Sequence, residues 1–322
     1  MAAAVAAGLL TAATAAWASP AGAAGPPPNS VRADSPYPVL FSVAADGTTP
    51  LTDPTAAPAG ANDWECHPSA AHPNPVVLVH GLGATMAENW GTMAPLLADN
   101  GYCVFALTYG RDPGEQYVGG VEKMEVSAPQ LAAFVDKVLA ATGASQVDLV
   151  GHSEGTVMPQ YYLKFLGGAA KVHRYVAIAP LYHGTSAYGL STLANAFPQE
   201  AATMEQLLVD GLCGSCAEFL TGSAFLTHLY ANGVYAVPGV TYTTIMTRYD
   251  EAVVPYTSGY LHAPNATNIV VQDQCPTDFS EHATLAFDPV VGQDILNALD
   301  PAERQPVPCT LVLPGVGAPW FR

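Results

Sequence analysis

Residues 147–155 read VDLVGHSEG and carry the strongest fold signal in the chain. A strand-like apolar run, 147–150, leads directly into a Gly-x-Ser-x-Gly turn, and residues 156–166 have the spacing of a helix. A serine between a strand and a helix in this way is held at a sharp turn, where its hydroxyl can act as a nucleophile. We therefore expect Ser153 to be a catalytic nucleophile, between two glycines that let the strand and helix approach.

Strand-like and helix-like segments alternate along the chain on both sides of this turn. Short continuous apolar runs suit strands that are buried on both faces, whereas other segments repeat apolar residues at helical spacing. This alternation predicts an α/β fold with a mostly parallel central sheet and flanking helices. The expected strands are 75–80, 103–109, 147–150, 175–179, 241–246 and 268–272, and the expected helices are 87–100, 127–141, 156–166 and 290–299.

A long, helix-leaning segment at about residues 183–240 interrupts the alternation. In a parallel sheet such an insertion lies above the carboxyl ends of the strands, where ligands bind. We therefore expect a helical cap or lid here. Its apolar residues fit ordinary core packing, a lid or an acyl-binding wall, and we favour the wall because large apolar surface above a site usually binds an apolar ligand.

The beginning of the chain predicts export from the cell. Residues 1–25 form an Ala-rich apolar run with two small-x-small cleavage sites and no charge before Arg32, as in a signal peptide. The basic residue usual near the start is missing, and an uncleaved membrane anchor is the less favoured alternative. We expect residues 26–62 to be an extended Pro- and Ala-rich lead-in and residues 63–322 to be the folded domain. The expected protein is secreted and extracellular, without stable membrane insertion.

The charge balance limits the expected partners. Ten Lys and Arg residues stand against 27 Asp and Glu residues, for a net charge of −17, and half of all residues are hydrophobic. The apolar content suffices for a sizeable core, and the scattered basic residues could not neutralise a run of phosphates. We therefore expect a folded monomer that binds neither nucleic acid nor, by charge, an anionic membrane.

Six cysteines agree with an oxidising compartment. The sequence does not determine their connectivity, so we pair neighbours along the chain. Cys213 and Cys216 also have the spacing of a redox motif, but they do not stand between a strand and a helix, and we favour a local structural disulfide. The expected disulfides are Cys66–Cys103, Cys213–Cys216 and Cys275–Cys309.

A serine nucleophile needs a base and an acid, and in this type of fold the acid precedes the histidine in the chain. His282 lies after the last expected strand and before the final helix, whereas its rival His262 precedes that strand. Asp250 follows the strand 241–246 and would orient the imidazole, with Glu251 as the competing carboxylate. The other candidates are expected to be surface or cap histidines, His173, His183 and His228, and solvated loop acids, Asp273 and Asp278.

Cleavage of an ester also needs N–H donors for the oxyanion. One donor is expected at Glu154, directly after the serine, and the other at Leu82 in the loop HGLG, residues 80–83, which follows a strand. The glycines beside Leu82 allow close approach of the backbone. We expect His80 to hydrogen-bond within its own loop and the carboxylate of Glu154 to be incidental.

Several longer motifs resemble one family. They are NDWECHPSAAHPNPVVLVHGLG from Asn62, NGYCVFALTYG from Asn100, VDLVGHSEG, YVAIAPLYHGT from Tyr175, TRYDEAVVPY from Thr247 and EHATLAFDP from Glu281. Together they resemble the secreted class 2 lipases of actinomycetes and, more distantly, the fungal lipase B type. This resemblance implies an α/β-hydrolase fold and metal-independent hydrolysis of triacylglycerols or other esters. It also implies the triad Ser153, Asp250 and His282, and it supports the disulfide Cys66–Cys103.

The residues and the resemblance together predict a secreted triacylglycerol lipase that works through an acyl-enzyme on Ser153. The expected substrate is a lipid or other ester, met at an oil–water interface, and no cofactor or metal is expected. A short-chain carboxylesterase or a polyester hydrolase would use the same residues and stays open. A catalytically inactive protein that binds lipid or cell wall is the alternative of another class, and the presence of each triad residue speaks against it.

Overall fold

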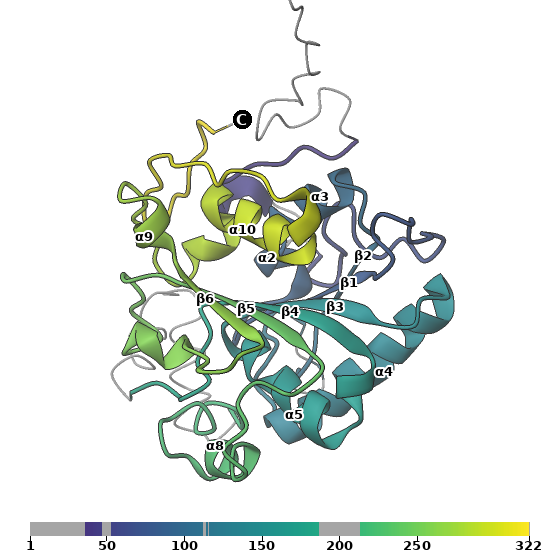
Figure 1. The fold of residues 1–322 in the computed structure, drawn as a ribbon, viewed down its shortest axis with the longest axis vertical. Coiled ribbons are helices and arrows are strands. Elements are labelled where there is room, and N and C mark those ends of the chain that lie inside the picture. The colour runs from purple at the N-terminus through teal and green to yellow at the C-terminus, as the bar shows by residue number, and fades with distance from the viewer. Residues whose placement is uncertain (1–35, 47–52, 112–113, 115, 187–212, 322) are drawn as a thin grey trace, which may run out of the picture.

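Six parallel strands form the central sheet of the computed structural model (Figure 1). The structure describes residues 36–46, 53–111, 114, 116–186 and 213–321. The strand order is β2-β1-β3-β4-β5-β6, and every neighbouring pair is parallel, which confirms the expected α/β fold. The strands are β1 (Val76–Val79), β2 (Val104–Leu107), β3 (Val147–His152), β4 (Val172–Ile178), β5 (Thr241–Met246) and β6 (Ala266–Val270).

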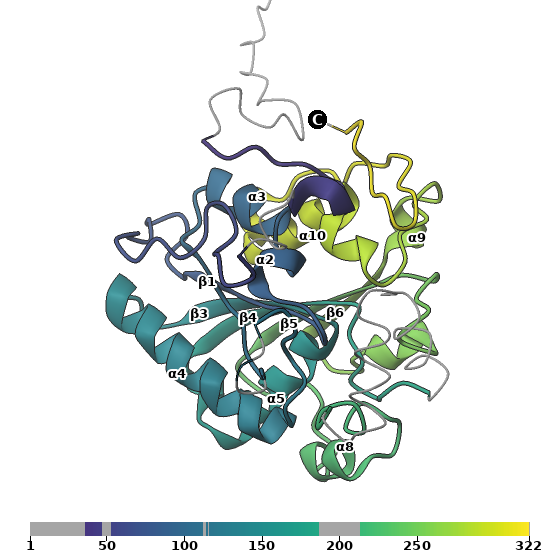
Figure 2. The same cartoon turned by 180° about the vertical axis from the view of Figure 1, so that it is seen from behind.

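Helices cover both faces of the sheet, which explains why its inner strands are apolar throughout. In β1, the side chains of Val77 and Val79 belong to the core on one face, and those of Val76 and Leu78 to the core on the other. Figures 1 and 2 show the two helical layers. One layer contains α4 (Met124–Thr142), α5 (Met158–Phe165) and α8 (Ala224–Leu229), and the other contains α2 (Met86–Asn89), α3 (Met93–Asp99), α9 (Val271–Gln274) and α10 (Pro289–Leu299).

Some element boundaries differ from those expected. The helix expected at 87–100 is interrupted after α2 and resumes as α3. Trp90 lies between the two and is fully buried, and Thr92 donates its hydroxyl to the carbonyl oxygen of Leu40 (2.6 Å) instead of capping α3. The last strand also ends earlier, at Val270, because α9 follows it directly. At the start of α3, a contact distant in sequence thus occupies the hydroxyl that could have capped the helix, and hydrophobic periodicity does not register such contacts.

The described part of the lead-in docks on the C-terminal tail. The N–H of Ala318 donates to the carbonyl oxygen of Phe41 (2.7 Å), and the rings of Phe41 and Phe321 meet edge to face with centroids 5.5 Å apart. The expected signal peptide, residues 1–25, lies outside the described residues. In the ranges given above, every helix is too short or too polar to cross a membrane.

The expected cap is described only at its two ends, residues 183–186 and 213–240. The second of these contains α8 between turns. Residues 187–212 lie outside the described residues, so the acyl-binding wall and the lid remain expectations there.

Three disulfides join the cysteines in the expected pairs. Their Cα–Cα distances are 5.8 Å, 5.4 Å and 4.9 Å, within the range that a disulfide requires. The second closes a local turn rather than standing between a strand and a helix, which agrees with a structural role instead of a redox role. The pairs are Cys66–Cys103, Cys213–Cys216 and Cys275–Cys309.

Candidate active site

Ser153 stands at the sharp turn that follows β3, as the first residue of the short 3-10 helix Ser153–Thr156. Its backbone φ is 54°, in the left-handed region that residues with a side chain rarely adopt. A Cβ atom on Gly151 would lie 1.9 Å from the carbonyl oxygen of Gly155, and one on Gly155 would lie 2.1 Å from that of Val79. Only glycine fits at these two positions, so the glycines of the motif are a steric condition for this turn.

The side chains of Ser153, His282 and Asp250 form one line of hydrogen bonds. The Ser153 hydroxyl donates to Nε2 of His282 (2.8 Å), and Nδ1 of His282 donates to both carboxylate oxygens of Asp250 (2.9 and 3.0 Å). We assign the ring proton to Nδ1 because an ionised carboxylate can only accept. Asp250 follows β5 and His282 follows α9, so the carboxyl ends of the parallel strands bring these three residues together.

The two carboxylates that competed in the sequence have different partners. Asp250 contacts the His282 ring and also accepts the backbone N–H groups of Ala252 (3.0 Å) and Val253 (2.7 Å). Its side chain is 2% exposed. Glu251 instead accepts the backbone N–H of His282 (3.3 Å). Asp250 is therefore the carboxylate that contacts the imidazole of His282, whereas Glu251 contacts the backbone of His282.

Burial and charge act in opposite directions on the His282 imidazole. Burial disfavours its protonated form, whereas the charge and hydrogen bond of Asp250 favour it, together with the charges of Glu251 and Glu281. The balance raises the pKa of His282 above its ordinary value. The ring is therefore a stronger base than free histidine, which suits the removal of a proton from Ser153.

The other candidates from the sequence lie away from the serine, and one of them differs from its expectation. His262 is exposed. Asp273 is exposed and forms an ion pair with Arg248, as expected of a solvated loop acid. The expectation for Asp278 was wrong, because this residue is fully buried and its Oδ1 accepts both the N–H (2.9 Å) and the hydroxyl (2.6 Å) of Ser280.

His152, inside the serine motif itself, is a site residue that the sequence reasoning missed. It is buried, and its Nε2–H donates to the backbone carbonyl of His282 (3.0 Å). Its Nδ1 contacts the side chain of Asn89, whose Oδ1 accepts the N–H of Gly81 (3.0 Å). Burial, followed by the nearby rings of His282 and His80, lowers the pKa of His152 to about 3, so this ring is neutral. Its place beside the serine was the one available signal.

Leu82, in the loop after β1, lines the pocket at Ser153. The neighbouring N–H groups are engaged, that of Gly81 by Asn89 and that of Gly83 by the carbonyl oxygen of Gly119 (2.8 Å). Within the described ranges, no hydrogen bond engages the N–H of Leu82. This is the arrangement that an oxyanion donor needs, since its N–H must be available when the charge forms.

The side chain of His80 forms one hydrogen bond within its own loop, as expected, and one to a residue that follows β2. Its Nδ1–H donates to the carbonyl oxygen of Gly81 (2.7 Å), and its Nε2 accepts the backbone N–H of Tyr109 (3.2 Å). Burial lowers the pKa of His80 to about 4, so the ring is neutral under ordinary conditions. Both nitrogens are occupied, and the ring supports the loop rather than offering a base.

The side chain of Glu154 is buried in the protein interior. A Cβ atom on Gly120 would lie 3.0 Å from its Oε2, and its carboxyl faces Tyr109 and Ser215. Burial, and then the charge of Glu218, raises the pKa of Glu154 well above its ordinary value. Burial therefore favours the uncharged form of this carboxyl, and its side chain points into the interior rather than contacting the hydroxyl of Ser153.

A small pocket opens at Ser153 and is lined mostly by apolar side chains. Leu82 and His282 form part of its wall, so the serine, the histidine and the loop after β1 all border the same space. Apolar walls with a few polar groups are typical of sites for small organic ligands. The remaining lining residues of the described chain are Leu181, Thr185, Phe219, Ala252 and Val253.

Comparison with known proteins agrees with this geometry. Triacylglycerol lipases of Pseudarthrobacter phenanthrenivorans and Burkholderia plantarii are each 34% identical to the chain over 97 residues, which is 29% of this chain. The matched segment spans only 28% and 25% of their respective lengths. The crystal structure of Aspergillus fumigatus lipase B has a similar fold, with a TM-score of 0.56, 18% identity, and coverage of 84% of this chain and 66% of that one. Residues 73–294, well over half of the sequence, match the family described as Lipase (class 2), and the chain therefore belongs to the class 2 lipase family.

Proposed function

We propose that this chain is a secreted carboxylic-ester hydrolase that cleaves acylglycerols through an acyl-enzyme on Ser153. The observation that carries the proposal is the unbroken line of hydrogen bonds from Asp250 through His282 to the serine hydroxyl. A serine hydroxyl is a poor nucleophile until a base takes its proton, and this line supplies both the base and the anion that orients it. Membership of the class 2 lipase family supports the same reaction.

In the first half of the reaction, Oγ of Ser153 attacks the ester carbonyl carbon while Nε2 of His282 takes the hydroxyl proton. The oxyanion of the tetrahedral intermediate accepts the N–H groups of Leu82 and Glu154. When the intermediate collapses, the bond to the alcohol oxygen breaks and His282 donates the proton to that oxygen. The alcohol leaves, and the acyl group remains on the serine.

In the second half, water takes the place of the alcohol. His282 removes a proton from the water as its oxygen attacks the acyl carbon, and the same two N–H groups accept the oxyanion. Collapse breaks the bond to Ser153, which regains a proton from His282, and a carboxylic acid is released. Asp250 keeps its charge throughout and stabilises the imidazolium.

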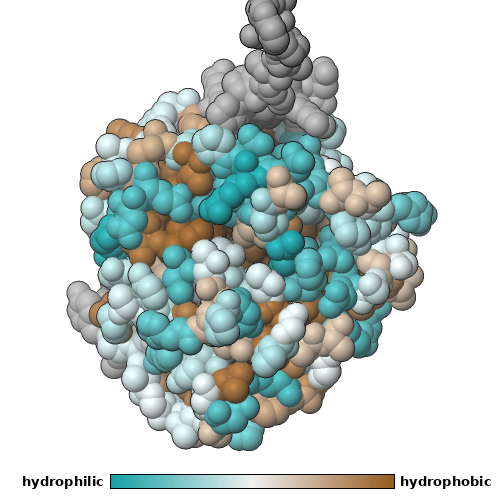
Figure 3. Space-filling view, in the orientation of Figure 1, coloured by the Kyte–Doolittle hydropathy of each residue, from teal (hydrophilic) through white to brown (hydrophobic). Residues whose placement is uncertain are grey.

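An acylglycerol substrate is supported by apolar groups inside and outside the pocket. Leu181, Phe219 and Val253 offer hydrocarbon contacts beside the serine. Outside, the rings of Tyr249 and Phe279 lie 5.7 Å apart and are 46% and 39% exposed, close in sequence to the acid and the base. Figure 3 shows apolar patches separated by polar groups on one face of the molecule. Exposed aromatic side chains near an active site suit contact with a lipid surface.

A short-chain carboxylesterase is the second candidate, and the size of the pocket favours it. Thr185 fixes part of the wall by donating its hydroxyl to the carbonyl oxygen of Ala252 (2.7 Å). A small pocket with a fixed wall would admit short acyl groups more readily than long ones.

The two candidates are separated by chain-length profiling. We would measure kcat/KM for p-nitrophenyl esters from acetate to palmitate and then the hydrolysis of emulsified triacylglycerols. A lipase should retain activity on long chains and gain activity on emulsions. A steep fall beyond short chains, with no gain on emulsions, would contradict the lipase and leave the carboxylesterase.

The nucleophile has its own test. Ser153→Ala should lower kcat by a factor of about 10⁴ to 10⁶, because no other group can form the acyl-enzyme. Ser145→Ala, in the exposed turn before β3, is the matched control and should keep its activity. Full ester hydrolysis by Ser153→Ala would refute the proposed role.

Secretion is supported by the Ala-rich start of the chain and by the three disulfides. Expression of the full chain in an actinomycete host and determination of the N-terminus of the exported protein test this part. The expected N-terminus lies near residue 25. A protein that remains in the cell with an intact start would contradict secretion.

A further inference from the structure

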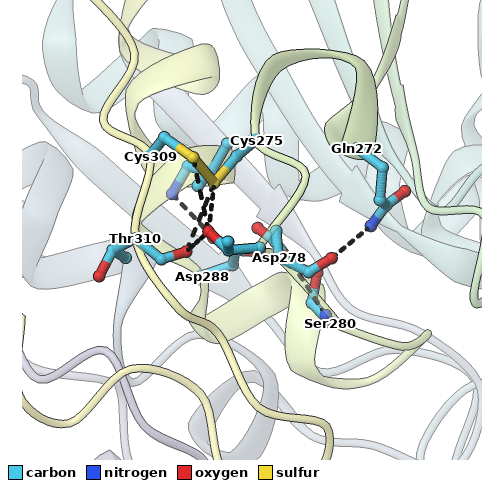
Figure 4. The surroundings of a disulfide bond; sticks show 9 residues. Gln272, Cys275, Asp278, Ser280, Asp288, Cys309 and Thr310 are labelled. Carbon is cyan, nitrogen blue, oxygen red and sulfur yellow. Dashed lines mark hydrogen bonds between the residues drawn. A yellow bond between two sulfur atoms is a disulfide. The ribbon is translucent and has the colours of Figure 1, made fainter.

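A second pair of carboxyl groups lies behind the loop of the base. Asp278 and Asp288 are both fully buried, and they lie close enough for the charge of Asp278 to act on the Asp288 carboxyl (Figure 4). Oδ1 of Asp278 accepts from Ser280, and Oδ1 of Asp288 accepts the N–H of Val290 (2.7 Å) at the start of α10. Among the described residues, no hydrogen-bond partner reaches Oδ2 of either aspartate. Each carboxyl group therefore has one buried oxygen whose hydrogen bonding no other described residue satisfies.

A hydrogen bond between two carboxyl groups requires a proton, because two carboxylates are both acceptors and repel each other. We propose that Asp278 and Asp288 share a single proton and that this acid pair positions the base His282 for catalysis. Burial, and then the adjacent charge of Asp278, raises the pKa of Asp288 well above its ordinary value. The nearby acids have other partners: Asp294 accepts from Gln274 (3.3 Å), and Glu281 accepts from Thr284 (2.8 Å) and Gly315 (3.1 Å).

The acid pair is connected to the base through Ser280, which precedes His282 by two residues. The carbonyl oxygen of Ser280 accepts the hydroxyl of Thr247 (2.7 Å). The amide of Gln272 donates both to the Thr247 hydroxyl (2.9 Å) and to the carbonyl oxygen of Asp278 (3.2 Å), and Figure 4 shows the second of these bonds. The result is a closed ring of polar contacts between the loop after β5 and the loop after α9.

The same closed ring of polar contacts sets the distance between the carboxylate of Asp250 and the imidazole of His282. Thr247 begins the turn that carries Asp250, whereas Ser280 leads to His282. A change at the acid pair would shift Ser280 first, and then the imidazole against its carboxylate. The catalytic part of this inference rests on the proposed function, whereas the shared proton can be tested without any substrate.

Single and double amide variants distinguish one shared proton from other arrangements. In Asp278→Asn or Asp288→Asn, the new NH₂ group can donate to the remaining carboxylate and so replace the proton. In the double variant, any orientation of the two amides that keeps the bonds to Ser280 and Val290 leaves two NH₂ groups facing each other. We therefore expect thermal midpoints close to that of the wild type for the single variants and a fall of roughly 5–10 °C for the double variant.

The pH dependence of unfolding gives an independent readout. The folded chain keeps a proton that the unfolded chain releases near the ordinary pKa of aspartate. The stability that this proton contributes is full below that pKa and is lost as pH rises through the raised pKa of the folded pair. Between about pH 5 and pH 9, the melting temperature of the wild type should therefore fall more steeply than that of either single variant.

Measurements of kcat test whether the acid pair positions His282. kcat at neutral pH should fall by less than about fivefold in each single variant and by more than about a hundredfold in the double variant, because only the latter displaces Ser280. The alkaline limb of the kcat profile should lie at higher pH in the single variants. Asp300→Asn, at an aspartate that caps the short helix Pro301–Glu303 in a similar way, is the control and should change none of these quantities.

The outcomes separate this inference from the proposed function. If the single variants melt with the same pH dependence as the wild type, or if the double variant is as stable as either single variant, the shared proton is refuted. If the stability data are as expected but kcat falls equally in all three variants, the pair does not position the base in the way we infer. If no form of the protein hydrolyses esters, the proposed function fails while the stability result still decides the shared proton.

Discussion

The two sides of Ser153 are organised in different ways. One side, which we call the base side, contains His282 and Asp250. Hydrogen-bonded polar side chains join its two loops, which follow β5 and α9, and the carboxylate of Asp250 contacts the imidazole of His282 directly. On the side of the proposed oxyanion donors, His80 and Glu154 are buried and uncharged, and the loops are joined mainly through the backbone. The serine thus stands between an anionic region and a neutral one.

This difference teaches what each side has to do. A base that becomes positively charged is stabilised by a nearby carboxylate. An oxyanion would be repelled by one, and backbone N–H dipoles in a neutral setting stabilise it instead. Burial raises the pKa of the Glu154 carboxyl and so favours its uncharged form next to the serine.

The largest expected effect comes from removing the base side alone. His282→Ala should lower kcat by a factor of about 10⁴ to 10⁶, leaving only the weak catalysis that binding and the oxyanion donors supply. Steady-state hydrolysis of p-nitrophenyl butyrate measures it. His262→Ala, at an exposed histidine, is the matched control and should stay within about twofold of the wild type. Similar losses in both variants would show that the base is assigned wrongly.

A smaller loss should separate the two neighbouring carboxylates. Asp250→Asn should lower kcat by about 10³ to 10⁴, and Glu251→Gln by less than about tenfold, because only Asp250 contacts the ring. Catalysis needs neutral His282, so its raised pKa places the acidic limb of kcat/KM above the ordinary histidine pKa. In Asp250→Asn, burial dominates and this limb should move to lower pH. A larger loss, or a similar shift, in Glu251→Gln would contradict the assignment.

The neutral side contains one buried acid, Glu154, and its replacement should have a modest effect on stability. The folded-state pKa of Glu154 is raised, so its contribution to stability is full below the unfolded pKa and is lost as pH rises through the folded pKa. Glu154→Gln carries no titrating proton. Its melting temperature should therefore fall less between about pH 5 and pH 9 than that of the wild type. Parallel melting curves for the two proteins would mean that Glu154 is already ionised when folded.

The smallest effect is expected at Asp273, outside both regions. Its ion pair with Arg248 is solvent-exposed, and such pairs contribute little to stability. Asp273→Asn should leave kcat and the melting temperature unchanged within error. A clear loss of kcat would mean that the exposed Asp273 also supports the base, and that the base side is not confined to buried groups.

Much of the fold could be predicted because its signals are local. The apolar run of β1 and the strand–turn–helix around Ser153 follow from the burial of a parallel strand on both faces and from steric limits at Gly151 and Gly155. The order of Ser153, Asp250 and His282 follows from the same architecture, because the carboxyl ends of parallel strands meet at one edge.

The rest depended on contacts that no local pattern contains. The choice of Asp250 over Glu251 for the ring, the burial of Asp278 and the position of His152 against the base loop are set by side chains far apart in the chain. Burial is the physical reason, since it decides whether an acid is solvated and charged or enclosed and protonated. The sequence alone determined the sheet, the sharp turn and the order of the three proposed catalytic residues. Only the tertiary structure decided which polar groups leave water, and therefore which of them carry charge beside Ser153.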